Sequence, residues 1–218
     1  MAVNDSVQDV PRPPPCVLLL NGFPGVGKLT TAKSLESKLQ PNQVPYRLMD
    51  NHLLIDPVIA IEPVRNQDHY VLRKEFRHLA MEGLKRLKKD IIIIWTAALA
   101  TSDMPTPYDD IDHFHEYLIF AKGRGVPLVF VNIVCDLDSN CKRVTERKET
   151  SKKIKLFDPD ILKTTRRDTS LLTREQAFSC AKENDMEGGL FYFELDNSNL
   201  DVEESASKIL QFLSGVLR

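Results

Sequence analysis

A glycine-rich loop between an apolar run and a helix-like run places the tightest limit on the fold of this chain. The loop has the sequence Gly22-Phe23-Pro24-Gly25-Val26-Gly27-Lys28. A buried strand that ends in such a turn exposes backbone N–H groups, and the N-terminus of the next helix adds the positive end of its dipole. The glycines let the backbone wrap closely around a phosphate, and Lys28 stands where an amine can reach the β- and γ-phosphates. The segment therefore predicts a binding site for ATP or GTP.

The loop departs from the full phosphate-loop pattern at one position. That pattern asks for a serine or threonine directly after the lysine, and here the residue is Leu29. Thr30 and Thr31 follow at once and offer hydroxyl groups. The alternative interpretation is a Gly/Pro-rich turn without a ligand. The strand-like run before the loop and the helix-like run after it favour phosphate binding.

The composition is that of one α/β domain without a strong charge bias. The chain has 218 residues, and 29 Lys and Arg residues stand against 31 Asp and Glu residues, which gives a net charge of -2. This balance offers no electrostatic footprint for nucleic acid or for an anionic membrane surface. No apolar run approaches the length of a membrane span, and the four cysteines are scattered without metal-type pairs. We therefore expect a soluble cytoplasmic protein.

Two segments differ in composition from the rest of the chain. Residues 1–15 are polar and then proline-rich, without the pattern of a signal or transit peptide. We expect a disordered tail there and a single domain over residues 16–218. Residues 147–168 contain eight basic side chains against four acidic ones. They form either a solvated face or a lid, since a lid that closes over phosphoryl transfer needs cations and excludes water.

Apolar runs that resemble strands alternate with segments of helical periodicity. The five runs cover residues 16–21, 44–49, 91–96, 127–134 and 190–195. Continuous Val/Ile/Leu strands that alternate with amphipathic helices predict a parallel sheet covered on both faces. In such folds ligands bind at the carboxyl ends of the strands. The loops that follow the five runs are therefore where we expect the functional residues.

Asp50 directly follows the second apolar run, at the sheet edge where the phosphate loop is expected. A carboxylate there could deprotonate an acceptor hydroxyl or hold Mg²⁺ through water. The other interpretation is a helix N-cap, a common role for aspartate at such a junction. The third run ends in Thr96 without the strand-end carboxylate that commonly supports Mg²⁺. Thr96 could hold a magnesium-bound water, or the metal could rely on Thr30 and Asp50.

Two pairs of arginines have the spacing of one helix face. Arg73 and Arg77 lie between the second and third runs and could grip an anionic acceptor. The alternative is surface ion pairs with neighbouring glutamates, Glu75 or Glu82. Arg143 and Arg147 follow the fourth run and lead into the basic segment, so they could stack on a base or reach the transferred phosphate oxygens.

Together, the glycine-rich loop, Asp50, the Arg143-x-x-x-Arg147 pair and the last run ending in Glu194-Leu195-Asp196-Asn197 resemble the small-molecule kinase branch of the phosphate-loop proteins. The chain is similar to shikimate, gluconate and chloramphenicol phosphotransferase-like kinases, and more distantly to nucleoside monophosphate kinases, over residues 16–217. The resemblance implies an α/β P-loop NTPase fold of three layers, with a five-stranded parallel sheet ordered 2-3-1-4-5 and a small lid. It also implies a base role for Asp50 and backbone contacts to adenine from the loop at Asp196 and Asn197. Adenylate-kinase-type enzymes likewise lack the hydroxyl after the lysine and then carry a threonine, which favours Thr30 as the residue that supports Mg²⁺.

These patterns lead us to expect an ATP-dependent phosphotransferase that moves the γ-phosphate to a small-molecule or nucleotide acceptor, with Mg²⁺ as its cofactor. Expected catalytic residues are Lys28, Asp50, Arg143 and Arg147. Expected acceptor contacts are Asp50, Arg73 and Arg77. Expected ATP contacts are Gly22, Phe23, Pro24, Gly25, Val26, Gly27, Lys28, Leu29, Thr30, Asp196 and Asn197. The alternative, motivated by the missing strand-end acid, is an ATP-binding module with little turnover that signals nucleotide occupancy to a partner.

Overall fold

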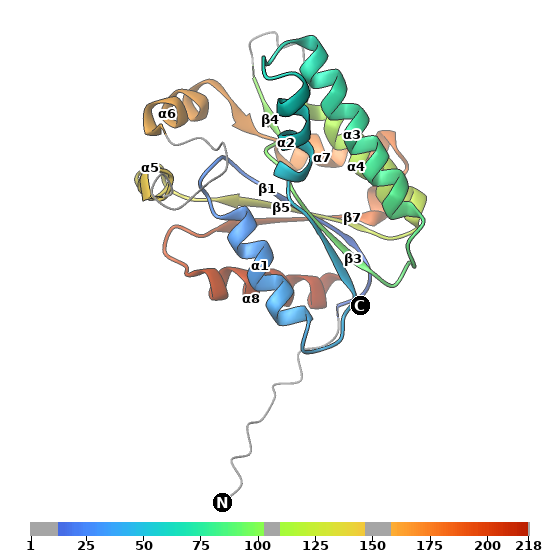
Figure 1. The fold of residues 1–218 in the computed structure, drawn as a ribbon. Coiled ribbons are helices and arrows are strands. Elements are labelled where there is room, and N and C mark those ends of the chain that lie inside the picture. Colours follow the sequence, from blue (N-terminus) through green and yellow to red (C-terminus); the bar gives the residue numbers. More distant parts are fainter. Residues whose placement is uncertain (1–12, 103–109, 147–157, 218) are drawn as a thin grey trace, which may run out of the picture.

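The expected parallel sheet forms the centre of the protein (Figure 1). The computed structural model describes residues 13–102, 110–146 and 158–217, and all structural statements concern those residues. Each strand of the sheet begins and ends within two residues of the run predicted for it. The strands are β1 (Val17–Asn21), β2 (Tyr46–Met49), β3 (Ile92–Thr96), β5 (Leu128–Val134) and β7 (Leu190–Asp196).

The order of the strands places β1 in the middle of the sheet. The order is β2-β3-β1-β5-β7, and all pairs are parallel. Counted within this sheet, the strands therefore follow the order 2-3-1-4-5. Val17 of β1 lies opposite Ile93 on one side and Leu128 on the other. The loop after β1 consequently leaves from the centre of the carboxyl edge, where side chains from both halves of the sheet can reach it.

Helices cover both faces of the sheet and make the three layers visible in Figure 1. On one face lie α1 (Lys28–Leu39) and α8 (Val202–Val216), which pack on Leu18 and Leu20 of β1. On the other face α3 (Gln67–Lys85), α4 (Asp110–Arg124) and α7 (Arg174–Glu183) pack on Leu19 and Trp95. Successive side chains of β1 thus enter opposite cores, because side chains alternate across a strand.

Three further helices lie at the carboxyl edge of the sheet or lead away from it. They are α2 (His52–Ile61), α5 (Leu137–Glu146) and α6 (Pro159–Asp168). Of the expected lid, residues 147–157 lie outside the described residues, and residues 159–168 form α6, with Asp158 as its N-cap. Residues 1–12 of the expected tail also lie outside the described residues. None of the described helices is long and apolar enough to cross a membrane.

A short antiparallel ladder was not expected from the sequence. It joins β4 (Ala100–Thr101) to β6 (Ser170–Leu171), with Ala100 opposite Leu171. A ladder of two residues per strand carries no hydrophobic period, so no sequence pattern marks it. It links the segment after β3 to the segment after α6.

A buried arginine holds the end of α3 against α4. Arg124 is 1% exposed, and its guanidinium donates to the carbonyl oxygens of Leu84, Leu87 and Lys88. These carbonyls lie at and beyond the C-terminus of α3, where a cation is favourable. Arg124 thereby supplies hydrogen-bond donors to the turn that leads into β3.

Replacement of this cation should destabilise the fold. In Arg124→Met the stem still fills the space, but three carbonyl oxygens in a buried or partly buried setting lose the guanidinium. We expect the free energy of unfolding in urea to fall by about 2–4 kcal/mol. Lys89→Met, at an exposed position in the same turn, is the control and should change it by less than about 0.5 kcal/mol. Equal unfolding midpoints for the two variants would contradict this role.

Candidate functional site

The phosphate loop leaves β1 after Asn21 and ends where α1 begins at Lys28. Gly27 is the N-cap of α1 and makes no side-chain cap, so the first backbone N–H groups of the helix are not capped by that residue. Such N–H groups and the helix dipole favour an anion at this point. The expected strand, loop and helix arrangement is therefore present.

Two glycines of the loop stand where a side chain would not fit. Gly22 has φ 152° and Gly25 has φ 92°, both in the region that disfavours other residues. A Cβ at Gly22 would overlap the carbonyl oxygen of Ile133 in β5. A Cβ at Gly25 would overlap Val144 and come within 2.5 Å of Nδ2 of Asn140, both in α5. The loop is thus held closely between β5 and α5.

The side chain of Lys28 folds back over the loop. Its Nζ donates to the carbonyl oxygens of Gly22 at 2.5 Å and Phe23 at 2.9 Å. The ammonium group therefore stays at the mouth of the loop, at the start of α1. A phosphate held there would find both the N–H donors and this cation within reach.

Arg143 lies beside the loop that follows β7. Its Nη1 donates to Oδ1 of Asn197 at 2.9 Å, and its Nη2 donates to the Asn197 carbonyl at 2.8 Å. Asn197 in turn donates from Nδ2 to the Val26 carbonyl at 2.8 Å. The structure therefore brings Arg143, Asn197 and the phosphate loop together as one unit. Arg147, the partner of Arg143 in the expected pair, lies outside the described residues.

An open hollow of about 450 Å³ adjoins the phosphate loop, next to Arg143 and Asn197. Thr30 is exposed and lines it, whereas Leu29 is half-buried. The carboxylate of Asp196 binds Ser198. The backbone N–H and the hydroxyl of Ser198 both donate to Oδ1 of Asp196. These bonds lower the pKa of the Asp196 carboxyl. The Asp196 side chain therefore stabilises the loop after β7. Asn197, and not Asp196, lines the hollow. The lining residues are Gly25, Gly27, Thr30, Thr31, Arg143, Glu146, Asn197, Leu200, Asp201, Val202 and Ser205.

Asp50 is held at the carboxyl edge by the strand beside it. The carboxyl is buried, and its Oδ1 accepts from the hydroxyl of Thr96 at 3.0 Å. That hydroxyl accepts from the backbone N–H of Asn51 at 2.9 Å. The N-cap position of α2 belongs to Asn51 rather than Asp50. Asp50 and Thr96, the two polar strand-end residues noted in the sequence, are thus joined at the carboxyl edge of β3, the strand next to β1.

Arg77 contacts α4 and Arg73 lies against Tyr70 of its own helix, and among the residues described neither forms the surface pairs considered from the sequence. Arg77 is buried, and its Nε donates to Glu116 of α4 at 2.5 Å. Arg73 is half-buried, with its guanidinium 5.7 Å from the ring centroid of Tyr70. Within the described ranges no carboxylate pairs with Arg73. Burial, and then the charge of Arg77, lower the pKa of Arg73.

Sequence reasoning did not single out Arg166 of α6. Its Nη2 donates to the Cys135 carbonyl at 3.0 Å and its Nη1 to Oδ1 of Asn140 at 3.0 Å. Its guanidinium lies 5.5 Å from the ring centroid of Phe23 in the phosphate loop. The sequence marked Arg166 as one cation in a basic segment, and no local spacing distinguished it from its neighbours.

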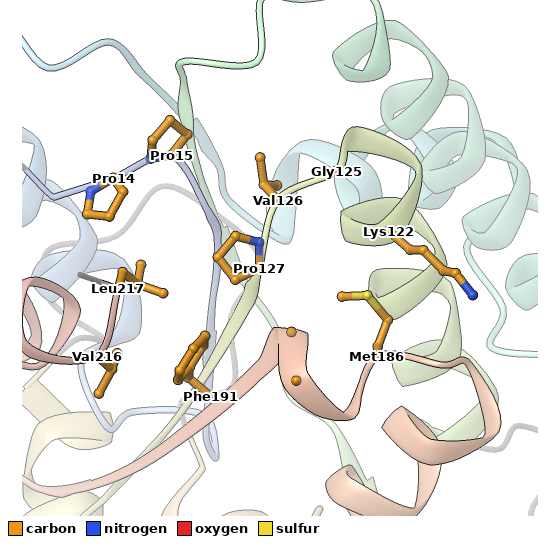
Figure 2. Close-up of a pocket in the computed structure, with 12 residues that line it drawn as sticks. Pro14, Pro15, Lys122, Gly125, Val126, Pro127, Met186, Phe191, Val216 and Leu217 are labelled. Atoms are coloured by element: carbon orange, nitrogen blue, oxygen red, sulfur yellow. The ribbon is translucent and has the colours of Figure 1, made fainter.

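A larger hollow lies at the opposite edge of the sheet, away from these groups. It measures about 540 Å³, and Figure 2 shows Pro14, Pro15, Val216 and Leu217 on its wall. The charged residue in the lining is Lys122, whose Nζ is bonded to the Asn184 carbonyl and to Asp185. The lining is otherwise apolar or glycine, so this hollow lacks the convergent polar groups of a phosphoryl-transfer site.

The contact between Gly25 and α5 can be tested with two alanine substitutions. In Gly25→Ala the methyl group would overlap Val144 and Asn140 at a positive φ, so the loop would have to shift. We expect a loss of about 1–3 kcal/mol in the free energy of unfolding. We also expect ATP to bind at least about tenfold more weakly, as for the loss of one good hydrogen bond. Both quantities follow from urea titration and isothermal calorimetry.

Gly83→Ala is the matched control. Gly83 lies within α3, and a Cβ there meets nothing within 4 Å. The control should raise the free energy of unfolding by about 0.5–1 kcal/mol and leave ATP binding unchanged. If Gly25→Ala behaved like Gly83→Ala, the close packing of α5 on the loop would be refuted.

The overall arrangement is shared by solved structures of low sequence identity. A candidate kinase from Chloroflexus aurantiacus has a TM-score of 0.57 at 14% identity, over 94% of this chain and 99% of that one. The tunicamycin resistance protein of Deinococcus radiodurans has a TM-score of 0.52 at 14% identity, over 91% and 95%. Thymidylate kinase of Candida albicans has a TM-score of 0.50 at 11% identity, over 93% and 92%. No family model and no curated protein matches the sequence. By its strand order, its phosphate loop and these likenesses, the chain has the α/β fold of the P-loop kinases.

Proposed function

We propose that the protein is a cytoplasmic ATP-dependent kinase that transfers the γ-phosphate of ATP to a hydroxyl group of a small-molecule or nucleotide acceptor. The observation that supports the proposal is that Asp50 lies at the same edge of the sheet as the phosphate loop, with one strand between them. β3 lies between β2 and β1, and its Thr96 joins the Asp50 carboxylate to the strand that borders the loop. A phosphate site and a fixed carboxylate therefore share one edge, which is the minimum that phosphoryl transfer to a hydroxyl needs.

ATP would lie along the loop with its phosphates at the start of α1 and its base in the adjoining hollow. The contacts of Arg143 favour its base-stacking role over a role at the transferred phosphate, because Asn197 fixes its guanidinium beside the hollow. Lys28 would exchange the carbonyl oxygens of the loop for phosphate oxygens, since a charged partner forms the stronger hydrogen bond.

The transfer step balances with the residues at this edge. An oxygen of the acceptor hydroxyl forms a bond to the γ-phosphorus, and the bond from that phosphorus to the bridging oxygen of ADP breaks. The proton of the hydroxyl passes to the carboxylate of Asp50. Lys28, at the mouth of the loop, compensates the charge that moves to the leaving oxygen.

The oxygen donors near the loop fit a magnesium ion. Mg²⁺ keeps several waters and is usually held by one or two protein oxygens together with the substrate phosphates. Thr30, on the hollow, and Asp50 offer such oxygens, and among the described residues no His, Cys, Asp or Glu cluster of three forms a dedicated cage. When bound, the ion would neutralise phosphate charge.

The acceptor site would lie between Asp50 and α3. Arg73 is a half-buried cation without a carboxylate partner in the described ranges, and such a group favours an anionic acceptor. Arg77 would position α3 against α4, because Glu116 already compensates its charge. Burial raises the pKa of Glu116, but the hydrogen bond and charge of Arg77 outweigh burial and lower it, so this pair is charged at neutral pH.

A module that binds ATP with little turnover remains the second candidate. The observation that favours it is the end of β3, where the hydroxyl of Thr96 stands in place of a carboxylate. Such a site has one acidic oxygen donor fewer for the metal.

The first test is ATP consumption by the purified protein with Mg²⁺ over a panel of nucleoside monophosphates, sugars and hydroxylated acids. We expect one anionic acceptor to stimulate turnover with one ADP formed per phosphorylated product. Lys28→Ala should lower that turnover at least about 100-fold, since it removes a charge from the transition state. Lys33→Ala, at an exposed position of the same helix, should not. ATP binding without stimulation by any acceptor would favour the second candidate.

The role of Asp50 has a separate signature. Asp50→Asn keeps the size of the side chain and removes the proton acceptor, so we expect kcat to fall about 10²–10⁴-fold. The dissociation constant of ATP should stay within about twofold, because the loop is untouched. Rapid-quench kinetics with the acceptor found in the panel would measure both. Full activity of this variant would exclude Asp50 as the base.

A further inference from the structure

Helix α6 is linked to the phosphate loop by a buried amide, in addition to the contact of Arg166 with the ring of Phe23. Asn140 of α5 is fully buried. Its Nδ2 donates to the Pro24 carbonyl at 2.9 Å, and its Oδ1 accepts from Nη1 of Arg166 at 3.0 Å. A single amide therefore supplies the donor that the loop needs and the acceptor that α6 needs. Aspartate lacks the donor, and an apolar residue lacks both.

Arg166 differs from the other basic residues of α6 in what it contacts. Lys163 pairs with Asp160 at 2.9 Å, and Arg167 pairs with Asp168 at 2.7 Å. In the described part of the chain, Arg166 donates to neutral oxygens alone, those of Asn140 and two backbone carbonyls. Its charge is therefore not compensated by an acid. Hydrogen bonds to neutral acceptors are weaker than bonds to charged ones, so an anion on the loop could attract this guanidinium away from them.

The other end of α6 continues into the acceptor side of the site. The hydroxyl of Ser102 donates to the Asp168 carbonyl at 3.2 Å, and Thr101 of β4 lies opposite Ser170 of β6. The backbone N–H of Ala100 donates to Asp110 at the start of α4, at 2.9 Å. Helix α4 carries Glu116, which holds Arg77.

Two buried asparagines anchor the base of this ladder to the sheet. Asn21 binds both backbone groups of Leu99, at 2.6 and 3.0 Å, and Asn132 donates to the Leu172 carbonyl at 2.8 Å. Leu99 and Leu172 are fully buried, whereas residues 100–102 and 170–171 are partly or fully exposed. The ladder is thus held to the sheet at its buried base, and its outer end, which bonds to the end of α6, is more exposed.

We propose that Asn140 is a positioning residue that couples the phosphate loop to α6, so that the loop shape around a bound nucleotide sets the position of Arg166 and of the β4·β6 ladder. The inference rests on the proposed function in one respect, that a nucleotide is the ligand of the loop. Beyond that function, we infer that nucleotide binding at the loop changes the position of the β4·β6 ladder on the acceptor side. The Pro24 carbonyl is the point of transmission, because hydrogen bonds weaken steeply as their distance and angle change.

Hydrogen exchange measured by mass spectrometry tests the coupling with the full chain. The probe is a non-hydrolysable ATP analogue with Mg²⁺. In the unmodified protein we expect the analogue to slow exchange at least about fivefold in peptides that cover residues 97–102 and 160–172, as well as in the loop. In Arg166→Met, which removes the guanidinium from the other side of the link, the loop should stay protected and the distant protection should disappear.

Asn140→Ala should give the same loss of distant protection, with its nucleotide affinity measured in parallel. Lys163→Met is the matched control on α6, because Lys163 pairs within its own helix, and it should keep the full response. Thermal unfolding without nucleotide supplies a test that does not depend on ligand. If the link exists, the double variant of Asn140 and Arg166 should lose less in Tm than the sum of the single losses.

The outcomes separate this inference from the proposed function. If the analogue binds and protects the loop while residues 97–102 and 160–172 do not change, the coupling is refuted and the kinase proposal stands. Equal distant protection in Arg166→Met and in the unmodified protein refutes it as well. If the analogue does not bind the unmodified protein, the kinase proposal fails. If the Tm losses of Asn140→Ala and Arg166→Met also add up in the double variant, the coupling between these two residues is refuted too.

Discussion

The close approach of α5 to the turn after β1 is the contact on which the candidate site depends. It exists because Gly25 has no side chain, and a methyl group there would overlap Val144 and Asn140. The turn of the loop thus sets where α5 can lie, and α5 brings Arg143 to the Asn197 loop. The missing side chain of Gly25 therefore determines how the phosphate loop, α5 and the Asn197 loop lie relative to one another, although they are far apart in the sequence.

The second constraint is electrostatic and concerns the acceptor side. A carboxylate in a buried place needs donors, and Asp50 obtains one from Thr96 of the neighbouring strand. Of the two arginines of α3, the buried Arg77 forms an ion pair with Glu116. The half-buried Arg73 forms no ion pair with any of the described acids. In the proposed function, the nucleotide would lie at the loop and the anionic acceptor beside Arg73.

Much of the fold could be predicted because its signals are local. Continuous apolar runs identified the strands of the main sheet, and the glycine-rich sequence identified the loop that joins β1 to α1. The resemblance to kinases supplied the strand order, which the structure confirms. The ladder of β4 and β6 escaped prediction because two-residue strands have no period. The positions of Asn140 and Arg166 escaped it for another reason. The bond from Asn140 to Pro24 spans 116 positions, and no spacing rule reaches that far.

Trp95 gives this arrangement an optical consequence. It is the sole tryptophan of the sequence, and its fully buried ring packs edge-on against Tyr117 and Phe120. The next residue, Thr96, is the one that holds Asp50. All tryptophan emission from the protein therefore originates one residue from the proposed chemistry. A buried indole emits at shorter wavelength than one in water, so ligand entry or local opening at the end of β3 can be followed in unlabelled protein, by colour and in real time.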